Sequence, residues 1–156
     1  MLDSLPVLVC IGAGIVGGVF FAFSSFVMRA LDKLPVAQGV AAMQHINAIV
    51  LNPLFLAVFV GTAVLAGICV FAGFFPWGAP RSQWLFASGL SYLVGGFGVT
   101  VAFNVPRNER LAKLDPESTD AAAYWPVYVR EWLRWNHVRT AACVLSTACA
   151  AGALTH

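Results

Sequence analysis

Charged residues are scarce in this sequence. Only 10% of its 156 residues are Asp, Glu, Lys or Arg, whereas soluble domains carry about 25%. Hydrophobic residues make up 60% of the chain, and a soluble fold of this length could not hide so much apolar surface. The composition therefore excludes an ordinary soluble domain and indicates an integral membrane protein.

Long uncharged runs support this interpretation. They cover residues 4–28, 34–80, 82–106 and 140–156, and a spanning helix needs about 20 apolar residues. The second run is too long for one span and begins with a polar part, while the fourth span must begin before residue 140. We therefore predict a single all-α domain over residues 1–156, an antiparallel four-helix membrane bundle. Its spans lie near 5–28, 50–75, 83–105 and 132–154, with a short amphipathic helix before the second and an interfacial start to the fourth.

The sequence has no C-x-x-C pair, which argues against a membrane thiol oxidoreductase. Its four cysteines all lie in apolar segments: Cys10, Cys69, Cys143 and Cys149. Free cysteines in such places usually serve as small buried hydrophobic residues. A bridge between Cys10 and Cys149 near the outer face stays open.

A glycine motif resembles a nucleotide-binding loop. Gly12, Gly14 and Gly17 form G-x-G-x-x-G, and Asp32 follows Gly12 by 20 residues. A phosphate loop needs a strand before it and a second strand that ends at the acid, but these glycines lie inside an unbroken apolar span. We interpret them as helix-packing positions. Gly14 and Gly18 also form G-x-x-x-G, which predicts a close helix contact or a homo-oligomer face.

The basic residues predict the orientation, because cytoplasmic loops are enriched in Lys and Arg. Two of them follow the first span, and six lie between the third span and the early part of the fourth, whereas only Arg81 lies in the other connection. We therefore place both termini outside, in what is predicted to be a bacterial inner membrane. The partners expected are membrane lipid and a lipophilic small molecule, and no nucleic-acid footprint is visible.

Polar residues gather on the cytoplasmic side of the predicted bundle. Antiparallel spans alternate in direction, so the position of a residue in its span converts to depth. One layer thereby collects Ser24, Ser25, Asn47, Asn52, Thr100, Asn104, Asn108, Asn136, His137 and Arg139. Polar groups at this depth are costly in lipid and usually face a cavity or each other. The layer predicts a binding pocket, with helix capping beside Pro53 and Pro106 as the alternative for single asparagines.

The early part of the fourth span is the most polar and aromatic segment. Helical spacing places Tyr128, Trp132, Trp135 or Asn136, and Arg139 on one stripe, and His137 points about 100° away from Asn136. The residue types predict no metal site, because the sequence has neither H-x-x-x-H nor E-x-x-H. Ligation of a haem or metal by His45 and His137 stays open as an alternative.

Four segments resemble the anthrone oxygenase-like membrane family, formerly a domain of unknown function. They are FFAFSSFVMRAL (20–31), AAMQHINAIVLNPLF (41–55), VTVAFNVPRNERLA (99–112) and WLRWNHVRT (132–140). The resemblance covers about residues 10–150 and implies a four-helix membrane protein. Some fungal members oxidise anthrones to anthraquinones with dioxygen and without a conventional cofactor. The family motif maps onto Asn47, Asn52, Pro53, Asn104, Pro106, Asn108, Trp132, Trp135, Asn136, His137 and Arg139.

We hypothesise that the pocket binds a flat phenolic or quinone-like molecule and oxygenates it, with no cofactor predicted. His137 is the candidate base, and Arg139, Asn136 and Asn104 would stabilise an oxyanion. The expected catalytic residues are thus His137, Arg139 and Asn136, and the expected substrate-binding residues are Asn47, Asn52, Asn104, Asn108, Trp132 and Trp135. Two other classes stay open, a carrier or binding module for a lipophilic metabolite and a structural subunit of a membrane complex.

Overall fold

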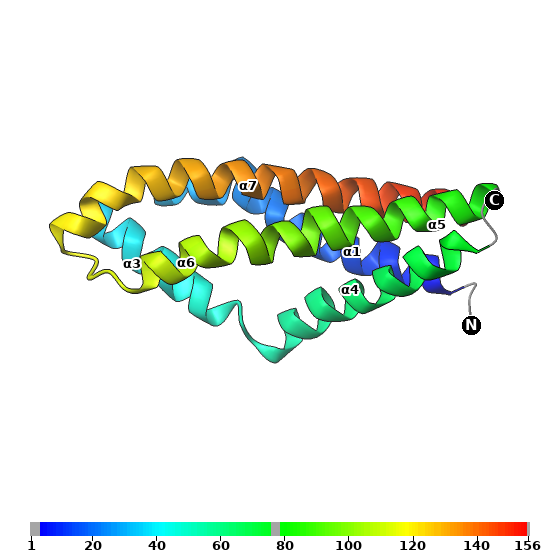
Figure 1. Ribbon diagram of the computed structural model, residues 1–156. Helices are drawn as coiled ribbons and strands as arrows, with labels where there is room; N and C mark the ends of the chain where they lie inside the picture. The colour runs from blue at the N-terminus through cyan, green and yellow to red at the C-terminus, as the bar shows by residue number, and fades with distance from the viewer. Residues whose placement is uncertain (1–3, 76–78, 156) are drawn as a thin grey trace.

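The computed structural model describes residues 4–75 and 79–155, and these form helices without any strand among them (Figure 1). The all-α prediction is therefore confirmed for the described part of the chain. In order, the helices are α1 (Leu5–Ala22), η1 (Phe23–Val27), α2 (Met28–Leu31), α3 (Val36–Ile49), α4 (Pro53–Phe74), α5 (Pro80–Leu90), η2 (Ser91–Gly98), η3 (Thr100–Asn104), α6 (Val105–Ala112) and α7 (Thr119–Gly152). The three η segments are π-helical.

Three helical stretches are long and apolar enough to cross a membrane. They are Leu5–Leu31, Pro53–Phe74 and Pro80–Ala112, as expected of an integral membrane protein. The fourth predicted span is part of α7, which begins well before residue 132. Its start is fixed by the Ser118 hydroxyl, which accepts a hydrogen bond from the backbone N–H of Ala121. Helix α7, which carries charged and polar side chains as far as Thr140, is not among the three apolar stretches.

The long helices pack lengthwise in a closed order. Helix α1 contacts α7 and α4, and α5 contacts α4 and α7 (Figure 1). One apolar cluster joins the beginnings of α1 and α5 to the ends of α4 and α7, through Leu5, Leu85, Cys69 and Ala150 among others. The start of α1 and the end of α7 therefore lie at the same end of the molecule. All four cysteines are free thiols.

The glycines of the opening motif lie within helix α1, so the motif does not form the strand–turn–helix of a nucleotide loop. Gly12 and Gly17 are buried, and a Cβ at Gly12 would collide with the Thr62 hydroxyl. A Cβ at Gly17 would lie 3.0 Å from Cβ of Cys143 on α7. The close contacts of α1 with α4 and α7 therefore depend on these two positions, whereas Gly14 and Gly18 lie on the exposed face of α1.

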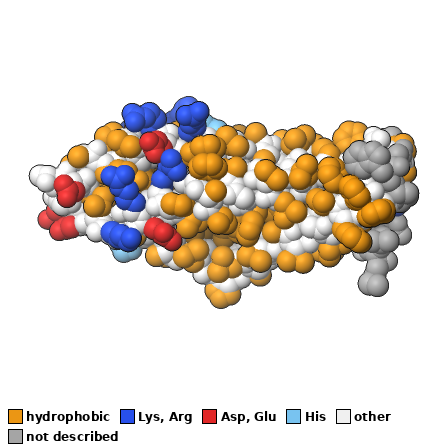
Figure 2. Space-filling view, in the orientation of Figure 1, with side chains coloured by type: hydrophobic (Ala, Val, Ile, Leu, Met, Phe, Trp, Pro, Cys, Tyr) orange, Lys and Arg blue, Asp and Glu red, His pale blue; other side chains and the backbone are white. Residues whose placement is uncertain are grey.

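Charge and apolar surface are separated along the molecule. Lys, Arg, Asp and Glu gather at the end where α3, α6 and the start of α7 lie (Figure 2). Along the rest of the helices large apolar side chains are exposed, among them Ile15, Leu54, Val64, Phe71, Val94 and Val144. Since monomeric soluble proteins rarely expose so much contiguous apolar surface, this surface fits contact with lipid.

A proline explains one of the π-helical segments. Pro106 has no backbone N–H and cannot bond to the carbonyl four residues earlier. The chain widens into η3 just before it, and widened turns of this kind are frequent at functional sites. As a result, Thr100 and Asn104 are presented to the interior of the molecule on a helix that continues through the proline.

Candidate functional site

Asn136 is the centre of a buried polar network in which α7 meets the end of α1. Its side chain is fully buried. Its Nδ2 donates to the Phe20 carbonyl at 2.7 Å and to the Ser24 Oγ at 2.7 Å. Its Oδ1 accepts a hydrogen bond from Nε of Arg139 at 2.9 Å. With both ends of the amide engaged, Asn136 holds the Arg139 side chain in place.

Arg139 is a buried cation that the surrounding side chains hold without neutralising it. It is 5% exposed, and its Nη1 lies 3.4 Å from Oγ1 of Thr100. Its Cζ lies 4.0 Å from the centroid of the Phe20 ring and 4.7 Å from that of Trp132. Within the described residues no carboxylate lies within 4.0 Å of it, and the ion pair found there joins Arg107 to Glu131. A buried charge normally has a partner, so the site is suited to an anionic ligand.

His137 joins the network from the outside. Its side chain is exposed, and its Nδ1 lies 3.0 Å from Oγ of Ser24. The same hydroxyl contacts Asn136 and, at 3.1 Å, Oγ1 of Thr140. The sequence places Ser24 in the polar layer but gives it no role, because the register of η1 against α7 is not visible in the sequence. It connects the imidazole to the amide that holds Arg139.

A second set of hydrogen bonds continues toward the charged end of the molecule. Oδ1 of Asn108 accepts from Nε1 of Trp132 at 2.8 Å and from the Tyr128 hydroxyl at 2.9 Å. Nδ2 of Asn47, on α3, donates to the Tyr128 hydroxyl at 3.4 Å. Burial raises the pKa of Tyr128, so its phenol is neutral and remains a donor to Asn108. Three predicted residues, Asn47, Asn108 and Trp132, thus meet at one buried tyrosine.

Asn104, the last residue of η3, contacts Trp132. It is fully buried, and its Nδ2 donates to the Trp132 carbonyl at 3.2 Å. Its Oδ1 is buried and has no hydrogen-bond partner in the structure. Of the predicted residues, Asn104 therefore has an unused polar atom inside the protein.

Two predicted residues lie apart from this network. Asn52 is exposed, and its Oδ1 caps α4 by accepting from the backbone N–H of Phe55 at 3.0 Å. Trp135 stacks on Phe103 at a centroid distance of 3.7 Å and is half-buried. The helical stripe allowed either Trp135 or Asn136 in the interior, and the structure buries Asn136.

The described histidines and acidic residues are not grouped as metal ligands. Within the described residues no group of three or more His, Cys, Asp or Glu is arranged to hold a metal ion. His45 is exposed on α3. Arg139, Asn136 and the aromatic rings around them are therefore the groups that define the chemistry of the buried site.

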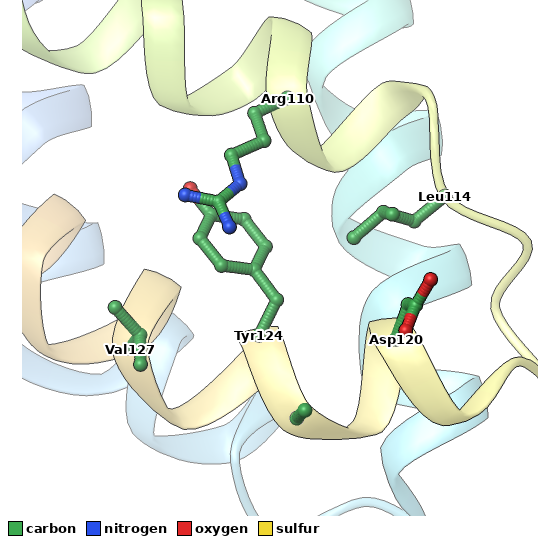
Figure 3. A pocket seen from close by; sticks show the side chains of 6 residues that line it. Arg110, Leu114, Asp120, Tyr124 and Val127 are labelled. Atoms are coloured by element: carbon green, nitrogen blue, oxygen red, sulfur yellow. The ribbon is translucent and has the colours of Figure 1, made fainter.

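An open cavity of about 330 Å³ lies between α6 and the start of α7 (Figure 3). Its lining consists of Arg110, Leu114, Asp120, Ala123, Tyr124 and Val127. The Arg110 guanidinium lies 4.0 Å above the Tyr124 ring. Burial raises the pKa of Tyr124 more than the nearby Arg110 and Arg107 charges lower it. None of the predicted site residues lines this cavity, although the Tyr124 ring contacts that of Tyr128.

The fold and site define a helical membrane protein with a buried, uncompensated guanidinium among amides and aromatic rings. The family model described as anthrone oxygenase matches residues 54–149. This is more than half of the chain, which therefore belongs to the anthrone oxygenase family. The matched region includes Asn104, Asn108, Trp132, Asn136, His137 and Arg139. Neither the curated proteins nor the solved structures that were compared with the chain include a match.

Proposed function

We propose that this protein oxygenates an anthrone, or a similar flat phenolic ketone, in the polar network around Arg139. The observation that carries the proposal is the buried guanidinium, which has no carboxylate partner among the described residues, in a member of the anthrone oxygenase family. A lipophilic ketone partitions into the membrane, and its enolate form supplies the negative charge that this site lacks. The arrangement is thus matched to the reactive form of the substrate.

The proposed topology has four spans with both termini outside a bacterial inner membrane, as a single domain. A hydrocarbon layer about 30 Å thick matches about 20 helical residues. Counted from Leu5 along α1, that length ends near Ser24, and counted back from Gly152 along α7 it ends near Trp132. The network then lies at the cytoplasmic boundary of the hydrocarbon layer, beside the charged end (Figure 2).

The proposed reaction begins with removal of a proton from the anthrone methylene group, which converts the ketone into an enolate. The electron-rich carbon forms a bond to dioxygen, and protonation of the distal oxygen gives a hydroperoxide. Loss of water from the hydroperoxide and the remaining C–H leaves a second carbonyl. Overall, anthrone and dioxygen give anthraquinone and water. The substrate supplies all the electrons, so the proposal names dioxygen as the sole co-reactant.

Each residue has a proposed role in this scheme. Arg139 stabilises the enolate oxygen, since a donor aimed at a developing charge in a water-poor site lowers the barrier most. Asn136 is a positioning residue, because its amide is already occupied by Arg139, Phe20 and Ser24. His137 takes the proton through the Ser24 hydroxyl. The Trp132 ring forms one wall for the flat substrate.

A second candidate function is a carrier or binding module for the same class of molecule. It is favoured by the number of hydrogen bonds that the network forms within itself, including both ends of the Asn136 amide and Oδ1 of Asn108. Such satisfied networks stiffen a protein and specify one arrangement. A contact between copies through the exposed Gly14 and Gly18 is compatible with either function.

Oxygen uptake by the detergent-purified protein with anthrone tests the proposal. We expect anthraquinone to form in a one-to-one ratio with the dioxygen consumed, above the rate without protein. The change His137→Gln removes the base and should slow turnover about 10²-fold or more. The matched control is His45→Gln, which also alters an exposed histidine and should keep the wild-type rate. Anthrone that is bound and released unoxidised by wild-type protein would favour the carrier.

A further inference from the structure

The unpartnered oxygen of Asn104 distinguishes this residue from the other amides of the network. An unsatisfied buried acceptor costs about 1–3 kcal/mol, and native proteins contain few of them. Oδ1 of Asn108 accepts two hydrogen bonds, and Oδ1 of Asn136 accepts one. Oδ1 of Asn104 accepts none. A polar group that the fold leaves unpaired in the interior is suited to a ligand.

The orientation of the Asn104 amide is fixed by its neighbour. The Trp132 carbonyl can only accept, so the amide nitrogen must face it, at 3.2 Å. The oxygen therefore points away from the Trp132 backbone. This leaves Asn104 as an acceptor for a ligand rather than as the oxyanion donor that the sequence predicts.

Asn104 and Arg139 approach the same side chain. Arg139 lies over the Trp132 ring, and Asn104 bonds to the Trp132 carbonyl. Arg139 also reaches Thr100, which lies one helical turn before Asn104 on η3. A ligand bound beside Trp132 would thus have a cation and an acceptor next to it.

We propose that Oδ1 of Asn104 accepts a hydrogen bond from a hydroxyl group of the substrate, next to the oxygen that Arg139 holds. Asn104 is then a specificity-determining residue. Together the two side chains distinguish a ketone or enolate flanked by a hydroxyl from one without it. The assignment rests on the proposed function for the identity of the substrate.

Equilibrium binding to two quinones tests this assignment without turnover. The probes are 1-hydroxyanthraquinone and unsubstituted anthraquinone, and the proteins are wild type, Asn104→Leu and the matched control Asn52→Leu. We expect wild type to bind the hydroxylated quinone about tenfold or more tightly, from the strength of one buried hydrogen bond. In Asn104→Leu, the ratio of the affinities for the hydroxylated and the unsubstituted quinone should be close to one. Asn52→Leu alters an exposed amide that caps α4 outside the network, so it should keep the ratio of the two affinities.

The outcomes separate this assignment from the proposed reaction. Equal preference for the hydroxylated quinone in wild type and Asn104→Leu would overturn it and assign Oδ1 to a bound water. If Asn104→Leu does not fold, Asn104→Ala removes the same acceptor without adding bulk. The ratio of its affinities for the two quinones then tests the assignment. A ratio that depends on Asn104 in a protein that consumes no dioxygen would reject oxygenation and retain the hydroxyl contact.

Discussion

Replacing Arg139 with Met should separate activity from stability. The substitution keeps an unbranched apolar side chain of similar length and removes the charge. It deletes the hydrogen bond to Asn136 and the contacts with the Phe20 and Trp132 rings. If Arg139 is a ligand-binding cation, the variant should lose most of its turnover and still fold.

The expected stability change is small because the contributions oppose one another. A hydrogen bond from a charged donor stabilises by about 1.5–3 kcal/mol, and a desolvated cation over aromatic rings adds about 2 kcal/mol. Burial of one ion costs several kcal/mol even after relaxation of the protein, and no ion pair offsets it within the described residues. We therefore expect the free energy of unfolding to change by less than about 2 kcal/mol in either direction.

The expected loss of activity is much larger. Removal of one donor to a developing oxyanion typically lowers kcat by about 10²–10³-fold. The assay combines thermal unfolding in detergent with dioxygen uptake on anthrone. Arg134→Met is the matched control, because this guanidinium is exposed and lies 5.9 Å from the Trp135 ring on the same helix.

Two results would refute this reasoning. A rate within about threefold of wild type would show that the charge is not used in the reaction, since even one lost oxyanion donor costs far more. A loss of more than about 4 kcal/mol in unfolding free energy, of the size seen when a buried pair is broken, would make Arg139 a structural residue.

Two further predictions concern the fold. Asn52→Ala should lower the free energy of unfolding by about 1 kcal/mol, because the α4 cap is lost, and should leave turnover unchanged. Thermal unfolding and dioxygen uptake measure the two effects. A large loss of rate would show that Asn52 takes part in the functional site. Gly12→Ala should destabilise by about 1–3 kcal/mol, because the new Cβ meets the Thr62 hydroxyl. Gly18→Ala has open space and serves as its control, and equal unfolding of both variants would contradict the packing argument.

The sequence predicts much of the arrangement on α7, because helical periodicity alone assigns residues to one face. Tyr128, Trp132 and Arg139 are buried on the predicted stripe. The same periodicity allows either Trp135 or Asn136 at the middle position. That choice is made by the carbonyl of Phe20 and the hydroxyl of Ser24, which satisfy an amide there.

Residues from other helices are harder to predict, because contacts across helices depend on their register. The sequence places Ser24 and Thr100 in the polar layer without a partner for either, and their contacts with His137 and Arg139 follow from the packing of η1 and η3 on α7. Asn52 illustrates the opposite difficulty. An asparagine before a proline at a helix start is equally typical of a cap and of a site, and the structure shows the cap.

In the proposed function, the neutral surroundings of Arg139 are what would allow it to act on a ligand. An aspartate in the place of Asn136 or Thr100 would pair with the guanidinium, and substrate would then have to compete with a built-in anion. Among the described residues, one amide oxygen, a hydroxyl and two aromatic faces orient the cation at a cost in stability but leave its charge uncompensated. In a water-poor interior that charge acts on a new anion with little screening. Under the proposed function, the same neutral partners would make an enolate, rather than the neutral ketone, the form that the site stabilises most.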